Sequence, residues 1–210
     1  MQNPSLPHPE TKQKGYTIIE LGIALTIIAV LIVAGLAGVT TVLNNSKANS
    51  QIEESGIVLA KLQSTLTSTS VSGMTTAVAV GSSYFPASRV VGTTVTNKFT
   101  GSEFVASNSA ELTSTTHGVA AAINVGAIYT ITGVPKAVCA NIATSLATLA
   151  NSAWVYSGTG VTEATSTSGT SNFTVGTSQI KAPGAQVQAA RVGTQCNLAE
   201  NVNLAFFLRP

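Results

Sequence analysis

The segment "KGYTIIELGIALTIIAVLIVAGLAGVTTVL" (Lys14–Leu43) contains one long apolar run that begins with a carboxylate, Glu20. No other charged residue follows until Lys47. At 1.5 Å per residue, residues 21–43 would form about 35 Å of helix, enough to cross a hydrocarbon core of about 30 Å. The sequence therefore predicts a membrane-spanning helix over residues 16–43. Its carboxylate needs a reason, because a charge in hydrocarbon costs about 2.5–3.5 kcal/mol.

Two simpler interpretations compete with a specialised helix. A cleaved secretory signal would place a basic region before an apolar run, and "AGLAG" (Ala34–Gly38) offers small residues for cleavage. However, the apolar regions of such signals span about 7–15 residues and follow a basic region rather than an acid. A plain single-pass anchor would hold Glu20 at the level of the lipid headgroups. That interpretation explains the helix but not the residues around Glu20.

The composition is poor in charge for a soluble protein, since 44% of the 210 residues are hydrophobic and 9% are charged. This length allows one or two domains. The net charge of +2 includes no basic cluster beyond Lys12 and Lys14, so we predict no nucleic-acid partner. All eight acidic residues are Glu, which disfavours an Asp-rich calcium loop.

The sequence offers no recognisable set of catalytic residues. Its histidines are His8 and His117, and it contains no HExxH, no CxxC, no glycine-rich phosphate loop and no Asp to complete a triad. His117 has no visible acidic or thiol partner, which favours a surface residue over a general base. Glu53 and Glu54 are expected to form a solvated helix face. We therefore predict a protein that is not an enzyme and binds no cofactor or metal.

The residues "KGYTIIELGIALTIIAVLIVAGL" carry a family resemblance, because Lys14 and Gly15 are followed by a carboxylate at the fifth position after the glycine. This pattern resembles the class III leader junction and N-terminal helix of type IV pilins, in particular the type IVb major prepilins. The resemblance implies that residues 1–15 are a leader, which a prepilin peptidase removes after Gly15. The same enzyme would methylate Tyr16 as the new N-terminus of a chain of 210 − 15 = 195 residues. Tyr16 departs from the Phe or Met that is usual in the family.

Cleavage after Gly15 would create an α-amine at Tyr16, four residues before Glu20. In apolar surroundings each of these charges needs an opposite partner. The amine and the carboxylate lie about one helical turn apart within a chain, and in an assembly the carboxylate can instead meet a neighbour's amine. The resemblance implies the second arrangement, in which Glu20 docks on the N-terminus of a subunit already in the filament. Buried charge pairs are well suited to specifying register.

The orientation of the span follows from Lys12 and Lys14, which precede it directly and are expected to stay cytoplasmic. Residues beyond about 45 would then be exported to an oxidising compartment. Cys139 and Cys196, the only cysteines, are therefore predicted to form a disulfide, with two free buried thiols as the alternative. In addition, "TGVPKAVCANIATSLATL" resembles the disulfide-bounded region of b-type pilins.

The helix is expected to continue beyond the membrane. The segment "SQIEESGIVLAKLQSTLTS" (Ser50–Ser68) has one apolar face, formed by Ile52, Leu59, Leu62 and Leu66. Their spacing of 7, 3 and 4 residues is helical and indicates packing against a globular part. A coiled-coil partner is the alternative, although so few turns do not require one.

The rest of the chain alternates between strand and helix patterns. Strands are predicted in "TTAVAVG", "ASRVVGTTV" and "GAIYTITGV", and a closing strand in "NVNLAFFLRP". A helix is predicted in "KAVCANIATSLATLANSAW", with Pro135 at its first turn. Residues 156–178 are rich in Ser, Thr and Gly and are interpreted as an exposed loop or edge hairpin.

This order of elements predicts an α+β fold, with a long N-terminal helix packed on the antiparallel sheet of a globular head. The pilin fold has the same arrangement. The predicted organisation is a leader over residues 1–15, a long helix over 16–70 and an exported head over 71–210.

Three functions remain open on the sequence. By resemblance, the chain is a structural subunit of a type IVb pilus, a filament for adhesion, aggregation or conjugation. It would partner with itself, with prepilin peptidase and with inner-membrane assembly machinery, and would move from the bacterial inner membrane to the cell surface. The second possibility is a minor pilin or a type II secretion pseudopilin. The third is a membrane-anchored domain that never polymerises.

Overall fold

The computed structural model describes residues 15–68, 74–107, 126–158 and 178–209. The leader up to residue 14, His8, His117 and most of the Ser/Thr-rich loop lie outside these ranges. The contacts of the chain divide it into two compact units, residues 1–42 and 43–210, which we call the N-terminal and C-terminal units. One helix, α1 (Ile18–Ser68), contributes to both of them.

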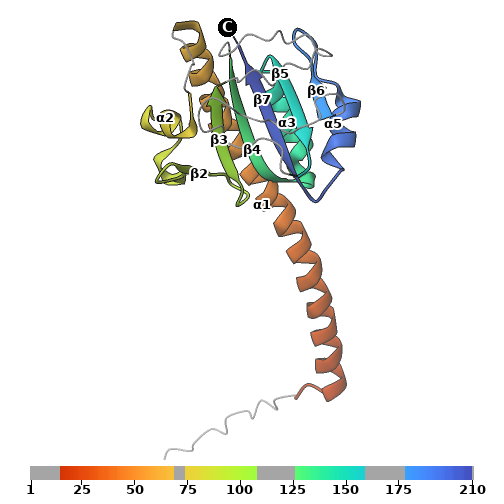
Figure 1. Ribbon diagram of the computed structural model, residues 1–210. Coiled ribbons are helices and arrows are strands. Elements are labelled where there is room, and N and C mark those ends of the chain that lie inside the picture. Colours follow the sequence, from red (N-terminus) through yellow and green to blue (C-terminus); the bar gives the residue numbers. More distant parts are fainter. Residues whose placement is uncertain (1–14, 69–73, 108–125, 159–177, 210) are drawn as a thin grey trace, which may run out of the picture. The chain divides into compact units, whose positions relative to one another are not determined.

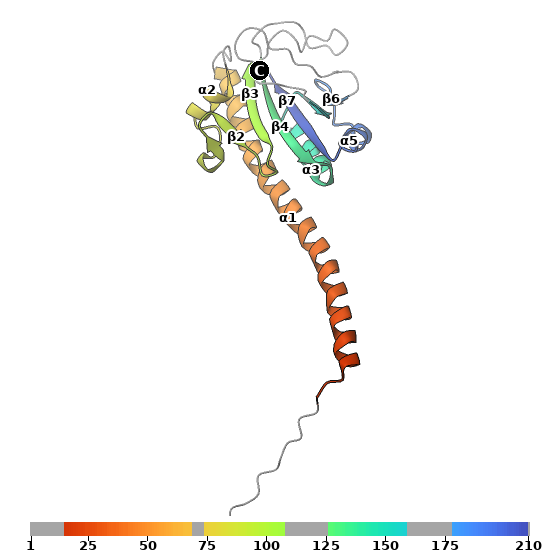
Figure 2. The same cartoon turned by 60° about the horizontal axis from the view of Figure 1, so that its bottom comes forward.

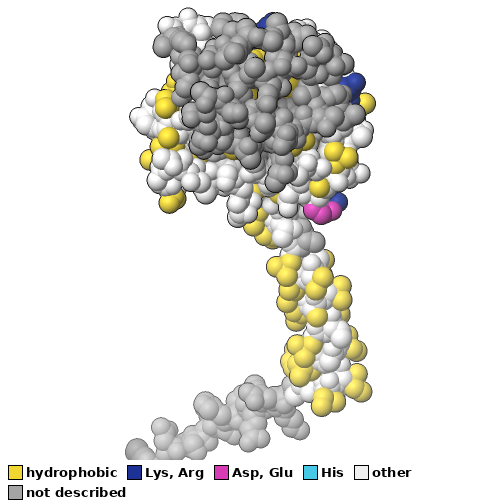
Figure 3. All heavy atoms as spheres, in the orientation of Figure 1, with side chains coloured by type: hydrophobic (Ala, Val, Ile, Leu, Met, Phe, Trp, Pro, Cys, Tyr) yellow, Lys and Arg dark blue, Asp and Glu magenta, His cyan; other side chains and the backbone are white. Residues whose placement is uncertain are grey.

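The N-terminal unit contains the apolar part of α1. Its large apolar side chains are exposed all round the helix, and Figure 3 shows them along the visible face of this segment. The most apolar window of α1 has a mean hydropathy of 2.6 and is unburied, so by length and composition α1 can cross a membrane. A helix that is apolar on every side is typical of a membrane span or of a core covered by other chains.

The C-terminal unit is built on a seven-stranded antiparallel sheet with the strand order β1-β2-β3-β4-β7-β5-β6 (Figures 1 and 2). The C-terminal strand β7 lies between β4 and β5, which makes it a central strand. The strands are β1 (Val90–Val91), β2 (Thr94–Thr96), β3 (Ser102–Ser107), β4 (Ala127–Pro135), β5 (Ser152–Tyr156), β6 (Gln179–Lys181) and β7 (Asn201–Leu208).

The main core lies between one face of this sheet and two helices, α1 and α3 (Lys136–Ala147). On α1, Leu59, Leu62 and Leu66 are buried and Ile52 packs against them, which confirms the predicted apolar face. The alternation of β7 supplies the sheet side, where Val202, Leu204, Phe206 and Leu208 belong to this core. The α+β architecture predicted from the sequence is therefore confirmed.

The opposite face of the sheet is also apolar. Alternate positions of the same strands form a second buried cluster, made of Phe104, Ile128, Trp154, Tyr156, Ala205 and Phe207. Strands that bury both faces read as nearly continuous apolar runs, and β5, "SAWVY", is buried at every position.

A disulfide joins Cys139 of α3 to Cys196 at the end of α5 (Ala189–Cys196), as predicted. The two Cα atoms are 5.7 Å apart. Cys139 and Cys196 both belong to the main core, together with Val192 of α5. The crosslink therefore ties α5, a short helix, to the helix that packs on the sheet.

Two predicted elements are wrong. "TTAVAVG" forms helix α2 (Thr76–Gly81) and not a strand, because the Thr75 hydroxyl accepts a hydrogen bond from Val78 N and caps the helix. Thr76 Oγ1 also binds the backbone of Val105 in β3, with Val105 N 3.0 Å away. Both threonines, which favour strands by propensity, thus hold helix α2 in place against the sheet.

The predicted helix over residues 136–154 ends early. α3 stops at Ala147, and residues 152–154 belong to β5, where Trp154 pairs with Ala205 of β7. In "ASRVVGTTV" the strand prediction is confirmed in part: a short 3-10 helix, η1 (Ala87–Arg89), precedes the β1–β2 hairpin. Gly92, with φ of +64°, allows the tight turn of this hairpin.

Replacing both cysteines by serine should lower the stability of the C-terminal unit. On the chain-entropy model, a loop with a sequence separation of 57 residues gives a loss of about 4 kcal/mol. Denaturant titration of the full chain in detergent would show this as a lower unfolding midpoint. Reduction of the wild-type protein should give a similar shift, and an unchanged midpoint would contradict a stabilising role.

Candidate functional site

The predicted processing junction lies directly before α1. Gly15 and Tyr16 precede the helix, and Tyr16 is 82% exposed. The Thr17 hydroxyl accepts a hydrogen bond from Glu20 N at 3.3 Å, and Thr17 O accepts one from Leu21 N at 3.1 Å. Thr17 therefore acts as the N-cap that starts the helix. The peptide bond after Gly15 lies outside the helix, between two exposed residues.

Glu20 lies in the first turn of α1 and is exposed. A carboxylate is favourable at this end of a helix, because the helix dipole places partial positive charge there. Tyr16 lies outside the helix, and its nitrogen belongs to the peptide bond with Gly15 in the uncut chain. The structure thus brings Gly15, Tyr16 and Glu20 together at one end of an exposed apolar helix.

The C-terminal unit contains a polar cluster within its core, which we call the Glu103 network. Its central residue, Glu103 of β3, is 1% exposed. Gln51, Ser55 and Tyr129 are fully buried, and Arg89 is 5% exposed. These five residues come from α1, η1, β3 and β4, so the network joins four elements of the unit.

The Glu103 carboxylate accepts hydrogen bonds from three side chains. Gln51 Nε2 donates to Oε1 at 2.7 Å, and the Tyr129 hydroxyl donates to Oε2 at 2.6 Å. The Arg89 guanidinium donates to both oxygens, one through each terminal nitrogen. Both oxygens of this buried carboxylate are therefore satisfied, and the fork of an arginine suits such a group.

The network extends toward solvent through Glu54. Its Oε2 lies 2.8 Å from Arg89 Nε as an ion pair without hydrogen-bond alignment, and its Oε1 lies 2.8 Å from Lys98 Nζ. The expectation that Glu53 and Glu54 form one solvated face is therefore wrong for Glu54, because Glu54 is half-buried while Glu53 is exposed. Charges of alternating sign run from Lys98 through Glu54 and Arg89 to Glu103.

Burial changes the acidity of two members of the network. Desolvation raises the pKa of the Glu103 carboxyl above its usual range, although the charge of Arg89 and the hydrogen bonds that Glu103 accepts oppose the shift. Desolvation, together with the negative charge of Glu103, holds the pKa of the Tyr129 hydroxyl well above its usual range. Glu103 is thus a buried acid whose proton affinity is increased by its surroundings.

Sequence reasoning missed the Glu103 network. Arg89 and Glu103 are single charges in the otherwise uncharged stretches "ASRVVGTTV" and "GSEFVAS". Isolated opposite charges in neighbouring strand-like segments can indicate a buried ion pair, because a buried charge needs a partner. Their actual pairing required the tertiary structure.

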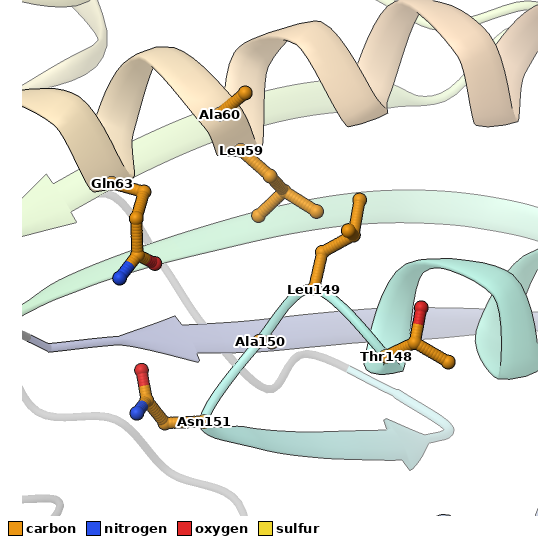
Figure 4. Close-up of a pocket in the computed structure, with 7 residues that line it drawn as sticks. All are labelled: Leu59, Ala60, Gln63, Thr148, Leu149, Ala150 and Asn151. Carbon is orange, nitrogen blue, oxygen red and sulfur yellow. The ribbon is translucent and has the colours of Figure 1, made fainter.

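A shallow cavity of about 500 Å³ lies between α1 and the turn that follows α3 (Figure 4). It is lined by Leu59, Ala60, Gln63, Thr148, Leu149, Ala150 and Asn151, none of which is charged. Leu149 is 52% exposed and lies close to Gly56 of α1. The lining offers one amide from each side and no titratable group.

Within the ranges that the structure describes, no group of three or more His, Cys, Asp or Glu side chains is placed to hold a metal ion. The described carboxylates with close partners bind cationic and hydrogen-bonding side chains.

No protein-family model and no curated protein matches the chain. Among solved structures, it is similar to the type IV b pilin from Salmonella typhi, with 16% identity, a TM-score of 0.47 and coverage of 77% of this chain and 99% of that one. It is also similar to TcpA, a type IV pilin from the Vibrio cholerae El Tor biotype, with 20% identity, a TM-score of 0.48 and coverage of 78% and 98%.

Replacing Arg89 by methionine should destabilise the C-terminal unit by about 3–5 kcal/mol, because it leaves the buried Glu103 carboxylate without its cation. The matched control is Lys136→Met, which removes the exposed pair with Glu200 and should cost at most about 1 kcal/mol. Urea unfolding followed by the fluorescence of Trp154, the single tryptophan, measures both. Equal losses in the two variants would contradict a structural role for the Glu103 network.

Proposed function

We propose that this protein is a structural subunit of a type IVb-like pilus, made as a membrane precursor and assembled with copies of itself into a surface filament. The observation that carries the proposal is the position of Glu20. It is the one charge in the exposed apolar part of α1 (residues 18–42), it lies in the first turn, and it follows the Gly15–Tyr16 junction at the spacing of type IV prepilins.

In this proposal prepilin peptidase cuts after Gly15 on the cytoplasmic side and methylates Tyr16. Glu20 then pairs with the α-amine of a subunit already in the growing filament. In apolar surroundings either charge alone would be costly, so the carboxylate and the amine each need the other as a partner. Their pairing also sets the axial register, since a displaced subunit would bury an unpaired carboxylate.

The exposed apolar residues of the N-terminal unit support the same proposal. A bilayer covers such a helix before assembly, and sister helices can cover it afterwards. The whole chain is poor in charge, with 9% charged residues, so packed copies would have few charged groups to desolvate. Inner-membrane assembly machinery would move the subunit from one setting to the other, and the C-terminal unit would face the exterior.

Two other functions would use the same helix. A minor pilin or a type II secretion pseudopilin would share the processing site but would act at a tip or as a piston. A membrane-anchored domain would keep residues 1–15 and would not polymerise. The use of the filament in adhesion, aggregation or conjugation belongs to the first proposal and follows from the resemblance alone.

Intact mass and N-terminal sequencing of protein sheared from cell surfaces test the proposal directly. We expect Tyr16 as the first residue, a mass greater by one methyl group, and the loss of two hydrogens for the disulfide. Gly15→Ala, or a bulkier replacement, should leave residues 1–15 attached, because the peptidase acts at this glycine. A chain that is absent from the sheared fraction and retains residues 1–15 would identify a membrane anchor instead.

Replacing Glu20 by alanine should leave membrane insertion intact or improved, because the span loses a costly charge. Filament yield should fall strongly, because the register contact is lost. Sheared-fraction immunoblots, together with membrane-fraction blots, measure both effects. Glu53→Ala, which removes an exposed carboxylate further along α1, is the matched control and should assemble normally. Normal filaments from the Glu20 variant would rule out the register role.

A further inference from the structure

The Glu103 network contains a chain of hydroxyl groups that can reverse its direction. The Tyr129 hydroxyl lies 2.6 Å from Glu103 Oε2 and 2.8 Å from Ser55 Oγ. Either hydroxyl of the Tyr129–Ser55 contact can be the donor. Ser55 Oγ also accepts a hydrogen bond from Gln51 Nε2 at 2.7 Å. The hydroxyl protons of Tyr129 and Ser55 can rotate, and they lie between the buried carboxylate of Glu103 and α1.

We propose that Glu103 takes up a proton in the folded protein as the pH falls, and that this loosens residues 87–98 from α1 while the rest of the C-terminal unit stays folded. The proton comes from water and forms an O–H bond on Glu103 Oε2. No covalent bond between heavy atoms changes. This inference concerns the C-terminal unit and does not rest on filament formation.

The hydroxyl chain explains how the fold accommodates the added proton. In the ionised state, Ser55 donates to Tyr129 and Tyr129 donates to Glu103. In the protonated state, the Glu103 carboxyl donates to Tyr129, and Tyr129 turns its proton to Ser55. Ser55 can then donate to the carbonyl oxygen four residues earlier in α1, a usual acceptor for a helical serine. Each hydroxyl keeps a partner in both states.

Arg89 is the group whose interactions weaken most when Glu103 is protonated. In the ionised state its guanidinium contacts Glu103 of β3 and Glu54 of α1, and its NH1 also lies 3.3 Å from Gln51 Oε1. Protonation removes the charge of Glu103, so Glu54 becomes the remaining anion, and Glu54 is shared with Lys98. Arg89 ends η1 and leads directly into the β1–β2 hairpin at the edge of the sheet. Weaker interactions of Arg89 therefore weaken the attachment of this hairpin to α1.

Every element packed around Glu103 contributes a charged or polar group to its surroundings. The charged and titratable groups that face it directly are Arg89 from η1 and Tyr129 from β4, and α1 contributes the neutral groups of Gln51 and Ser55. Beyond Arg89 lie Glu54 of α1 and Lys98 of the segment after β2. The four charges of this set alternate in sign and sum to zero when Glu103 is ionised. Protonation leaves one excess positive charge beside α1.

The direction of the pKa shift agrees with this arrangement. Because burial raises the pKa of Glu103, the folded protein binds a proton at a pH where the unfolded chain is still ionised. The contribution of Glu103 to stability is fully present below the unfolded pKa and is lost as the pH rises through the folded pKa. If the hairpin moves away while Glu103 stays buried, the carboxyl loses Arg89 and its pKa rises further. Acid therefore favours local opening without favouring global unfolding.

The first experiment is a pH titration of the full chain in detergent micelles, with carbon-13 at the glutamate side-chain carboxyls. The signal of Glu103 is assigned by its absence from Glu103→Gln. We expect its midpoint at a higher pH than that of the glutamate carboxyls of the same chain unfolded in urea. A Glu103 midpoint equal to that of the unfolded chain, or at lower pH, would overturn the proposal.

The second experiment measures backbone amide exchange of residues 87–98, corrected for the intrinsic effect of pH on exchange. Protection of this segment should fall through the Glu103 midpoint, while protection of β4 and β7 stays constant. In Glu103→Gln, which copies the neutral acid, protection should already be low at neutral pH and should no longer depend on pH. Protection that stays constant with pH in the wild type would overturn the proposed loosening.

Two further variants separate the hydroxyl chain from a purely structural role. Ser55→Ala removes the acceptor for the reversed Tyr129 proton, so the Glu103 midpoint should move to lower pH. Glu53→Gln removes an exposed carboxylate from the same helix and should change neither the midpoint nor the exchange. A Ser55 variant that lowers stability but leaves the midpoint in place would rule out the hydroxyl chain.

Discussion

Burial of one face of α1 is the interaction on which the C-terminal unit depends. The apolar side chains of this face and those of α3 cover the same surface of the sheet, and together they form the main core. An antiparallel sheet with an apolar face cannot remain open to water, because the hydrophobic effect favours covering it. The helix that carries the exposed apolar residues of the N-terminal unit therefore also covers part of the sheet in the C-terminal unit. A substitution in the buried face of α1 would change the stability of the C-terminal unit. A substitution among its exposed apolar residues would instead change the contacts that this surface makes with its surroundings.

The Glu103 network is an exception inside that core. A carboxylate and a guanidinium that are almost wholly buried give up hydration, and their attraction offsets this cost only where the remaining hydrogen bonds are also made. Here Gln51 and Tyr129 complete the hydrogen bonds of Glu103, and Glu54 forms an ion pair with Arg89 Nε. An apolar cluster of similar size would stabilise the fold at least as well. The polar cluster instead defines one position for η1 and the β1–β2 hairpin relative to α1, since any other position would leave charges unpaired.

The first turn of α1 and the part of α1 around Gln51 use the same principle in different surroundings. In the proposed assembly, Glu20 in the first turn of α1 pairs with the α-amine of another subunit. Near Gln51, the charges find their partners within the folded chain. In both places a charge in low-dielectric surroundings specifies geometry more than it adds stability. Under the proposed assembly, the first interaction would set the register between subunits, and the second sets the geometry within one subunit.

The sequence by itself determined the features that depend on composition and on the spacing of apolar residues. These are the apolar span, the buried face of Leu59, Leu62 and Leu66, the strands β4 and β7, and the pairing of the only two cysteines. Local propensity failed where tertiary contacts competed with it. Thr75 and Thr76 favour strands, but Thr75 caps helix α2 and Thr76 accepts a hydrogen bond from Val105 N. Residues 152–154 join β5 because β7 offers hydrogen-bonding partners there. Only the tertiary structure decided that Glu54 turns inward and that Arg89 meets Glu103. The physical reason is that a charge in a sequence shows the need for a partner, whereas the fold decides which partner lies within reach.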